Sequence, residues 1–293
     1  MRTFLKASFA RVAAASGALR RRHAGRLVVL TFHRVRPGGD EPRTRAMRAL
    51  DAPADDFRRL LAWMRARYEP LALADWLARG TPPPRAAFAV AFDDGWADNY
   101  HHAFPILREL GIPATIFLAT GAVEDRMPFW WQMPGLSDAE IEMMKRRPHR
   151  WIEDRLAERP DFRQAHAEDF LTWDQIREMG RSGLVRFGAH GHRHALLDQL
   201  ERAEAAEDVR RCWELMVRHV PDALVPALAW PNGNARADLA ADLEALGLRA
   251  AFGTARGALA APGAARWNLP RNDVDRNVAV HADLWNWLLW RAH

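Results

Sequence analysis

Two adjacent aspartates, Asp93 and Asp94, follow an apolar run, and Gly95 comes directly after them. The run 88–92 has the composition of a buried strand, so the strand would present both carboxylates at its end. A carboxylate pair in that place needs partners, because an ionised group is costly to bury unless it is paired or bound to a metal. The glycine lets the backbone turn sharply after the pair and leaves room for a substrate.

Two histidines provide suitable partners. His190 and His194 stand four residues apart where the apolar run 185–190 gives way to a loop, so both imidazoles can point at one centre. With one carboxylate they form a two-histidine, one-carboxylate set, which leaves coordination positions open for water and substrate. His192 lies between them and is expected to face away. Taken alone, each histidine would be interpreted as a surface or hydrogen-bonded residue.

A metal site also explains why there are two aspartates. A metal ion that polarises a carbonyl and lowers the pKa of its water still benefits from a base during attack. Neighbouring side chains at the end of a strand can divide these tasks, one binding the metal and the other taking the proton.

From residue 26 onward, apolar β-rich runs alternate with amphipathic stretches. Strands are predicted at 26–32, 86–92, 113–120, 184–190, 223–231 and 249–255, and helices at 54–68, 100–111, 172–183, 200–220 and 235–247. Such alternation predicts an α/β fold with parallel strands and outer helices, either a barrel or a doubly wound sheet. In both architectures the chemistry lies at the carboxyl ends of the strands.

The strand ends carry His33, the aspartate pair, His190 and the stretch 230–233, and these groups are expected to share one rim. Several stretches there resemble the NodB-homology polysaccharide deacetylases of carbohydrate esterase family four. They are "AFDDG", "HGHRH" and "LAWPNGN", supported by "VVLTFHRV", "GIPATIFLATGAV", "PFWW" and "NLPRNDV". The resemblance runs from about residue 26 to about residue 275, and it implies a distorted (β/α) barrel of about seven units.

The resemblance also implies roles. Asp93 would be the catalytic base, while a divalent metal would be held by Asp94, His190 and His194. Zinc is the first choice of metal, with cobalt, nickel or manganese as alternatives. The stretch after the fifth predicted strand would bind substrate, and a backbone N–H there would help the metal to stabilise the oxyanion. The residues concerned are Trp230, Pro231 and Asn232.

The chain departs from the family pattern in two places that matter for catalysis. The usual general-acid histidine near the C-terminus has no convincing match, which leaves His281 as a weak candidate and His33 as a second one. His33 could donate a proton or contact substrate, or it could be buried and satisfied by the backbone. The usual catalytic arginine is also missing from its expected place. Arg271 could substitute for it, or could form a structural salt bridge.

A polar insertion at about 124–167 interrupts the alternation and contains Trp130 and Trp131. A lid or a sugar-stacking platform would suit such flat side chains, and Trp131 is a candidate substrate contact, although ordinary packing is the alternative. The stretch 146–150 within the insertion is expected to be solvated charge.

Residues 1–25 are expected to form a basic amphipathic helix preceding a catalytic domain at 26–293. Lys6 and Arg11 interrupt the apolar stretch that a secretory signal would need. The helix could lie on an anionic membrane surface or pack on the outside of the domain. These features favour a cytoplasmic enzyme or one on the inner face of the membrane, and leave a periplasmic location open. The net charge of +5 is too diffuse to indicate nucleic-acid binding.

The sequence therefore predicts a metal-dependent carbohydrate N-deacetylase involved in exopolysaccharide or carbohydrate metabolism. It would remove N-acetyl or N-formyl groups from an amino-sugar glycan or a lipid-linked sugar. Two alternatives remain at this point. One is a catalytically weak carbohydrate-binding relative, favoured by the missing acid and arginine. The other is a non-haem iron oxygenase, which uses the same ligand set but is usually built on an all-β fold.

Overall fold

The computed structural model describes residues 17–39, 45–263 and 265–292. At its centre is a sheet of eight strands whose pairings are all parallel. The order is β10-β1-β5-β6-β7-β8-β9, with β4 also paired to β5. The strands are β1 Leu27–Phe32, β4 Glu69–Pro70, β5 Ala87–Phe92, β6 Ala114–Leu118, β7 Val185–Ala189, β8 Leu224–Ala229, β9 Ala250–Phe252 and β10 Asn272–Asp273. The six predicted strands are confirmed, whereas β4 and β10 were not predicted.

One short segment joins the two edges of the sheet. Leu269 forms a parallel bridge with Phe252 of β9, and β10, a few residues further on, pairs with β1. This segment therefore closes the sheet into the distorted (β/α) barrel that the sequence predicted.

Alternate strand residues fill the barrel interior, because successive side chains along a strand point to opposite faces. Ala87, Ala89 and Ala91 of β5 lie in one apolar cluster with Phe117 and Phe252, whereas the other β5 residues pack against the outer helices. Trp76 of α5 (Leu73–Arg79) joins the inner cluster beside the first residues of the strands and closes that end. Asp93 continues the series 87, 89, 91, so its side chain belongs to the inner face at the opposite, open end.

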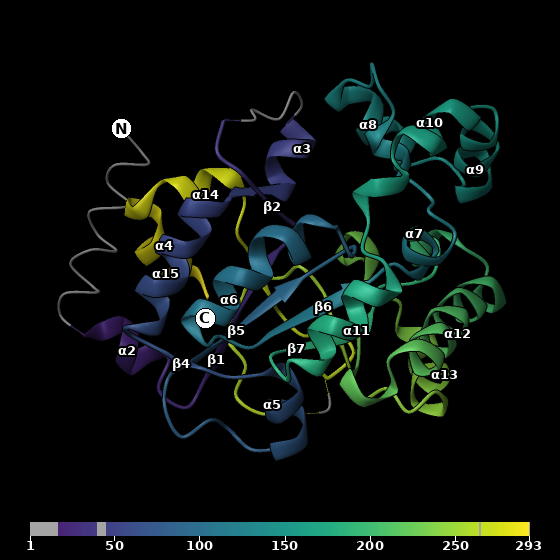
Figure 1. Cartoon of the computed structure of the whole chain (residues 1–293). Coiled ribbons are helices and arrows are strands. Elements are labelled where there is room, and N and C mark those ends of the chain that lie inside the picture. Colours follow the sequence, from purple (N-terminus) through teal and green to yellow (C-terminus); the bar gives the residue numbers. More distant parts are fainter. Residues whose placement is uncertain (1–16, 40–44, 264, 293) are drawn as a thin grey trace.

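Helices surround the barrel (Figure 1). Helix α4 shows why they form: Phe57, Leu60, Leu61 and Met64 recur at helical spacing and are all buried on the face toward the sheet. The outer helices are α4 Ala54–Arg65, α6 Phe104–Leu110, α11 Trp173–Arg181, α12 Arg202–His219, α13 Ala240–Ala245, α14 Arg276–Val280 and α15 Trp285–Arg291. Among the described residues, no helix is both long and apolar enough to cross a membrane.

The insertion follows α7 (Thr120–Glu124) and forms a helical group of its own, set apart from the barrel in Figure 1. Its helices are α8 Asp138–Met144, α9 His149–Ala157 and α10 Pro160–Ala165. Trp130, Ile141, Met144 and Ile152 make a small separate core beneath them. Trp130 is therefore a packing residue.

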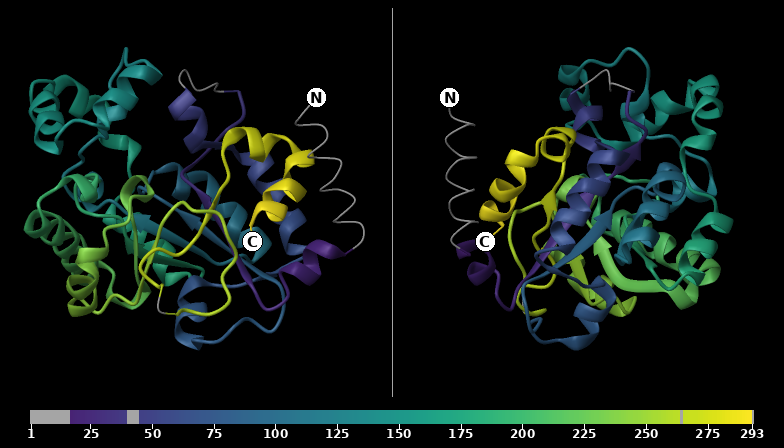
Figure 2. Two further views of the ribbon diagram at one scale, coloured as in Figure 1. Left: turned by 180° about the vertical axis from the view of Figure 1, so that it is seen from behind. Right: turned by 60° about the vertical axis from the view of Figure 1, so that its left-hand side comes forward.

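Two smaller parts lie beside the C-terminal segment that contains α14 and α15 (Figure 2). A parallel ribbon of β2 (Arg34–Arg36) and β3 (Asp51–Pro53) is joined through α3 (Arg45–Leu50). The described part of the N-terminal segment contains α2 (Ala18–Arg22), and His23 beside it is buried and bonded to Tyr68 and to the Ala292 carbonyl. Most of the predicted basic N-terminal helix, residues 1–16, lies outside the described residues.

Candidate active site

The two adjacent aspartates at the end of β5 point to different partners. The chain turns sharply there, because Asp94 has a φ of 78° and Gly95 a φ of 90°. An aspartate tolerates this left-handed conformation better than most residues, and glycine tolerates it freely. The turn directs the Asp93 carboxylate toward residues 269–273, which close the barrel, and the Asp94 carboxylate toward the loop after β7.

Asp93 is bound by Arg271 at two points. The guanidinium donates from Nη1 and Nη2 to the two carboxylate oxygens, at 2.6 and 2.8 Å. Arg271 is fully buried, and its Nε also donates to the Gly253 carbonyl at 3.0 Å. Burial alone would raise the pKa of Asp93, but the Arg271 charge and the nearby imidazole of His190 outweigh burial and lower it. Arg271 therefore forms a buried salt bridge with the predicted base, Asp93.

Asp94 faces the two predicted histidine ligands. Its Oδ1 lies 3.4 Å from His190 Nε2 and 3.2 Å from His194 Nε2, and all three side chains are buried. One ligand atom from each residue lies within 4.8 Å of the others. Burial opposes the charge of Asp94, but the imidazoles outweigh it and hold the pKa of that carboxyl well below its usual value.

The hydrogen bonds of this cluster fit a divalent cation. His190 Nδ1 lies 2.8 Å from the Ala229 carbonyl, which can only accept, so Nδ1 carries a proton and Nε2 is the atom turned to the centre. Asp94 Oδ1 is buried and has no hydrogen-bond partner. This buried oxygen, which accepts no hydrogen bond, faces two imidazole nitrogens. One carboxylate oxygen and two imidazole nitrogens are a set of ligand atoms that zinc and similar metals bind.

His33 lies beside the aspartate and arginine pair. Its Nε2 is 4.0 Å from Asp93 Oδ2, and 22% of its side chain is exposed. Asn99 donates to the His33 backbone carbonyl at 2.8 Å, which fixes the position of the residue. The His33 ring therefore lies at the open rim. The alternative that this histidine is buried is wrong. The other acid candidate, His281, is exposed and bonded to the Asn277 carbonyl at the end of α14.

The predicted substrate-binding stretch follows β8. Trp230 is 1% exposed and donates from its indole to the Trp267 carbonyl at 2.8 Å, and Pro231 is also buried. The Trp230 amide is used as well, donating to the Phe252 carbonyl. Asn232 has a φ of 56°. Any contact of this stretch with substrate would therefore come from the backbone or from Asn232.

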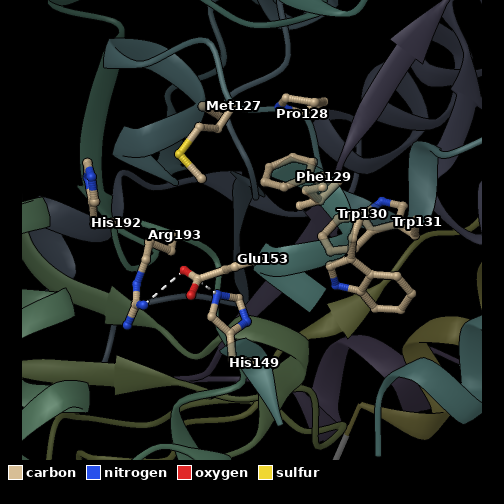
Figure 3. Close-up of a pocket in the computed structure, with 11 residues that line it drawn as sticks. Met127, Pro128, Phe129, Trp130, Trp131, His149, Glu153, His192 and Arg193 are labelled. Carbon is tan, nitrogen blue, oxygen red and sulfur yellow. Dashed lines mark hydrogen bonds and ion pairs between the residues drawn. The ribbon is translucent and has the colours of Figure 1, made fainter. Parts of the chain in front are cut away.

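Trp131 covers one side of the histidine cluster. Its ring stacks on Phe129 with centroids 4.5 Å apart and meets His194 edge to face at 4.8 Å. Figure 3 shows Phe129 and the two tryptophans side by side along the hollow that separates the insertion from the histidine loop. The insertion therefore contributes an aromatic wall to the site.

Arg193 holds the histidine loop to this insertion. It lies between His190 and His194 in the sequence and donates to Asp208 of α12 at 2.9 Å. It also donates to Glu153 of α9 at 2.9 Å, as Figure 3 shows. Bonding to His149 and the charges of His149 and Arg193 lower the pKa of Glu153 to about 2. The arginines of the stretch 146–150 are exposed, as expected of solvated charge. His149 departs from that expectation at only 8% exposed, because folding of α9 turns its ring toward Glu153.

His192 faces away from the cluster, as predicted. It is bonded to Thr120 and lies 3.3 Å from Asp125. Burial, with a contribution from Arg211, lowers its pKa. One residue of the site was missed from the sequence: Trp96 donates from its indole to Asp94 Oδ2 at 2.8 Å. An aromatic residue two positions after a predicted ligand was the only signal for it.

Comparison with known proteins gives consistent results. The family model described as polysaccharide deacetylase matches residues 80–251. A poly-beta-1,6-N-acetyl-D-glucosamine N-deacetylase of Escherichia coli strain K12 is 28% identical over 167 residues, which are 56% of this chain. The matched part is only 20% of that relative, so the chain resembles about a fifth of it.

Solved structures share the fold. IcaB from Ammonifex degensii matches with a TM-score of 0.61 and 24% identity, covering 89% of this chain and 97% of that one. The Streptococcus pyogenes deacetylase PplD, solved in complex with acetate, also gives a TM-score of 0.61, at 18% identity and with 86% and 93% covered. The motifs at the strand ends, the barrel and the match over more than half of the sequence agree: the chain belongs to the polysaccharide deacetylase family.

Proposed function

We propose that this protein is a metal-dependent hydrolase that removes the N-acetyl group from an amino sugar within a glycan. The observation that carries the proposal is the pairing of two units on one rim. The first unit is the Asp93 carboxylate, which is bonded to the buried Arg271. The second unit, next to it, is the set of possible metal ligands Asp94, His190 and His194. The first unit suits proton transfer and the second suits metal binding.

The metal would be held by Asp94, His190 and His194, and zinc suits two imidazoles and one carboxylate. When bound, such an ion polarises a carbonyl oxygen and lowers the pKa of water at the site. The chain's own contribution is to fix the ligands, through the Ala229 carbonyl behind His190 and through Trp96 behind Asp94.

Asp93 would take the proton from the attacking water. The arginine keeps the pKa of Asp93 low, so the carboxylate is ionised and able to accept a proton at neutral pH. The Arg271 guanidinium donates to both carboxylate oxygens, and this two-point contact orients the carboxylate.

His33 would supply a proton to the leaving amine. As the amide C–N bond breaks, the nitrogen must gain a proton, and the acyl group leaves as acetate. His33 is close to Asp93 and partly open to solvent, as a group that exchanges protons should be. The Asn232 amide is the candidate backbone donor to the oxyanion, since Pro231 has no N–H and the Trp230 amide is already used.

The substrate would be an N-acetylated glycan whose sugar ring lies against Trp131. This side chain is partly exposed at the rim, where a flat apolar surface can stack on a sugar face. The Escherichia coli relative is a poly-beta-1,6-N-acetyl-D-glucosamine N-deacetylase, which makes a β-1,6-linked N-acetylglucosamine polymer the first substrate to try. An N-formylated, lipid-linked amino sugar would use the same groups and is the second.

The test combines metal content with product release. Purified wild type would be compared with Asp94→Ala and His190→Ala by inductively coupled plasma mass spectrometry, with acetate and formate release measured on the same samples. His192→Ala is the matched control, because this neighbouring buried histidine faces away from the centre.

We expect about one metal per chain in wild type and in the control, none in the two ligand variants, and acyl release only where metal is present. Metal that is retained without any acyl release would favour a carbohydrate-binding relative. A wild type that releases acetate after complete metal removal would contradict the proposal.

A further inference from the structure

We propose that Trp96 is a positioning residue that sets the metal affinity of this site by fixing the Asp94 carboxylate, an inference that rests on the metal site proposed above. The Trp96 indole N–H donates to Asp94 Oδ2 at 2.8 Å. The other oxygen, Oδ1, is thereby turned to His190 and His194 and accepts no hydrogen bond. One oxygen is occupied by the protein and the other is kept for the cation.

The indole has little freedom to rotate. Trp96 is 1% exposed and stacks on Phe170 with centroids 5.1 Å apart, while Phe129 meets it edge to face at 5.3 Å. Its backbone neighbours are also held: the Ala97 amide donates to the Asp169 carbonyl at 2.8 Å. Phe129 and Phe170 lie near the beginning and the end of the insertion, so both ends of the insertion clamp the ring.

A cation lies on the face of the same ring. The Arg34 guanidinium carbon is 4.2 Å from the Trp96 ring centroid, and Arg34 Nε donates to Asp98 Oδ2 at 2.7 Å. A positive charge over an indole draws electron density from the ring and strengthens the N–H as a donor. Arg34 also follows His33 directly. The contact between Arg34 and Trp96 therefore connects the residue that holds Asp94 to the residue beside Asp93.

The indole suits this task because it only donates. It cannot compete with the aspartate as a ligand, and it cannot accept a proton from the site. Without it, the carboxylate of Asp94 could rotate and offer either oxygen, or both, to the cation. Loss of such an outer partner typically lowers metal affinity by about 10- to 100-fold.

The experiment measures metal affinity directly. Apo protein would be titrated with Zn²⁺ against a chromophoric chelator for wild type, Trp96→Phe and the control Trp76→Phe. Trp76 is an equally buried tryptophan whose indole donates to the Ala260 carbonyl at 3.2 Å, at the closed end of the barrel. We expect the Zn²⁺ dissociation constant to rise about 10- to 100-fold for Trp96→Phe and to stay unchanged for Trp76→Phe.

Two further measurements separate the hydrogen bond from packing. Replacing Trp96 with benzothienylalanine keeps the shape of the ring and removes only the N–H, so this variant remains informative if Trp96→Phe does not fold. The visible absorption of the Co²⁺-loaded forms reports the coordination geometry, and we expect it to change in both Trp96 variants and not in the Trp76 control.

The outcomes distinguish this inference from the proposed function. If wild type binds Zn²⁺ tightly and the benzothienylalanine variant binds it equally well with an unchanged Co²⁺ spectrum, the role of Trp96 is disproved while the metal site stands. If wild type itself binds no metal, the proposed function fails and this inference fails with it.

Discussion

The rim of the barrel has two halves that begin at neighbouring aspartates and differ in the hydrogen-bond partners of the two carboxylates. Asp93 has both oxygens occupied by a buried guanidinium, whereas Asp94 keeps one buried oxygen without a hydrogen-bond donor. The first half is electrostatically complete within the protein. The second offers the donor set to which the proposed function assigns a metal ion.

In the proposed function, this contrast would let one dipeptide serve two chemical tasks. Two adjacent aspartates have nearly the same intrinsic pKa, so their difference comes from what surrounds each one. The left-handed turn at Asp94 separates them into two environments.

Asp93→Asn should remove the base and leave the metal half intact. We expect kcat for acetate release to fall by about 10²- to 10⁴-fold, the usual contribution of a general base. Metal content should remain that of wild type, in contrast to Asp94→Ala. Equal loss of metal in both variants would mean that the halves do not work separately.

Arg271→Met should be costly because it leaves a buried carboxylate without its partner. We expect a loss of about 3–5 kcal/mol in the free energy of unfolding, measured by urea denaturation at pH 7. Arg59→Met, at an exposed ion pair with Asp56, is the control and should cost less than about 1 kcal/mol.

The Arg271 effect should also depend on pH. The pKa of Asp93 is lowered in the folded protein, so the ion pair stabilises the fold above the unfolded pKa of about 3.9. This stabilisation is lost as the pH falls through the folded pKa. The difference between wild type and Arg271→Met should therefore shrink in acid, and a difference that grew there would refute the sign.

His33→Gln tests whether the Asp93 half also holds the acid. We expect kcat for amide hydrolysis to fall by about 10²-fold, at the lower end for general acid catalysis. Hydrolysis of p-nitrophenyl acetate should fall much less, because its leaving group needs no proton. If both substrates lose activity equally, His33 has another role.

Glu153→Gln tests the ion pair between Arg193 and Glu153, which joins the histidine loop to the insertion. Glu153 has a pKa of about 2, so it stabilises the fold above pH 4.5, and this contribution fades as the pH falls toward 2. Because the pair is partly exposed and screened, we expect a loss of about 1 kcal/mol at pH 7. Thermal unfolding at pH 7 and pH 3 should show a smaller gap at the lower pH, with Glu207→Gln as an exposed control.

Much of this protein could be predicted from residues close together in the chain. Alternating apolar periods located six of the strands, because buried strands and amphipathic helices have different repeats. The meeting of Asp94, His190 and His194 could be predicted because the carboxyl ends of parallel strands meet on one rim. The very short β4 and β10 have too few residues to show a period.

The sequence could not reveal which side chains from distant segments contact each other. Arg271 and Asp93 are 178 residues apart, and only closure of the barrel through residues 269–273 puts one on the other. Trp96 was predicted by no motif, since the direction of an indole N–H depends on how Phe129 and Phe170 clamp the ring. Local sequence determined which side chains reach the rim, because strand periodicity is a local property. Tertiary packing alone decided how their charges are paired, because a pairing depends on distances between segments.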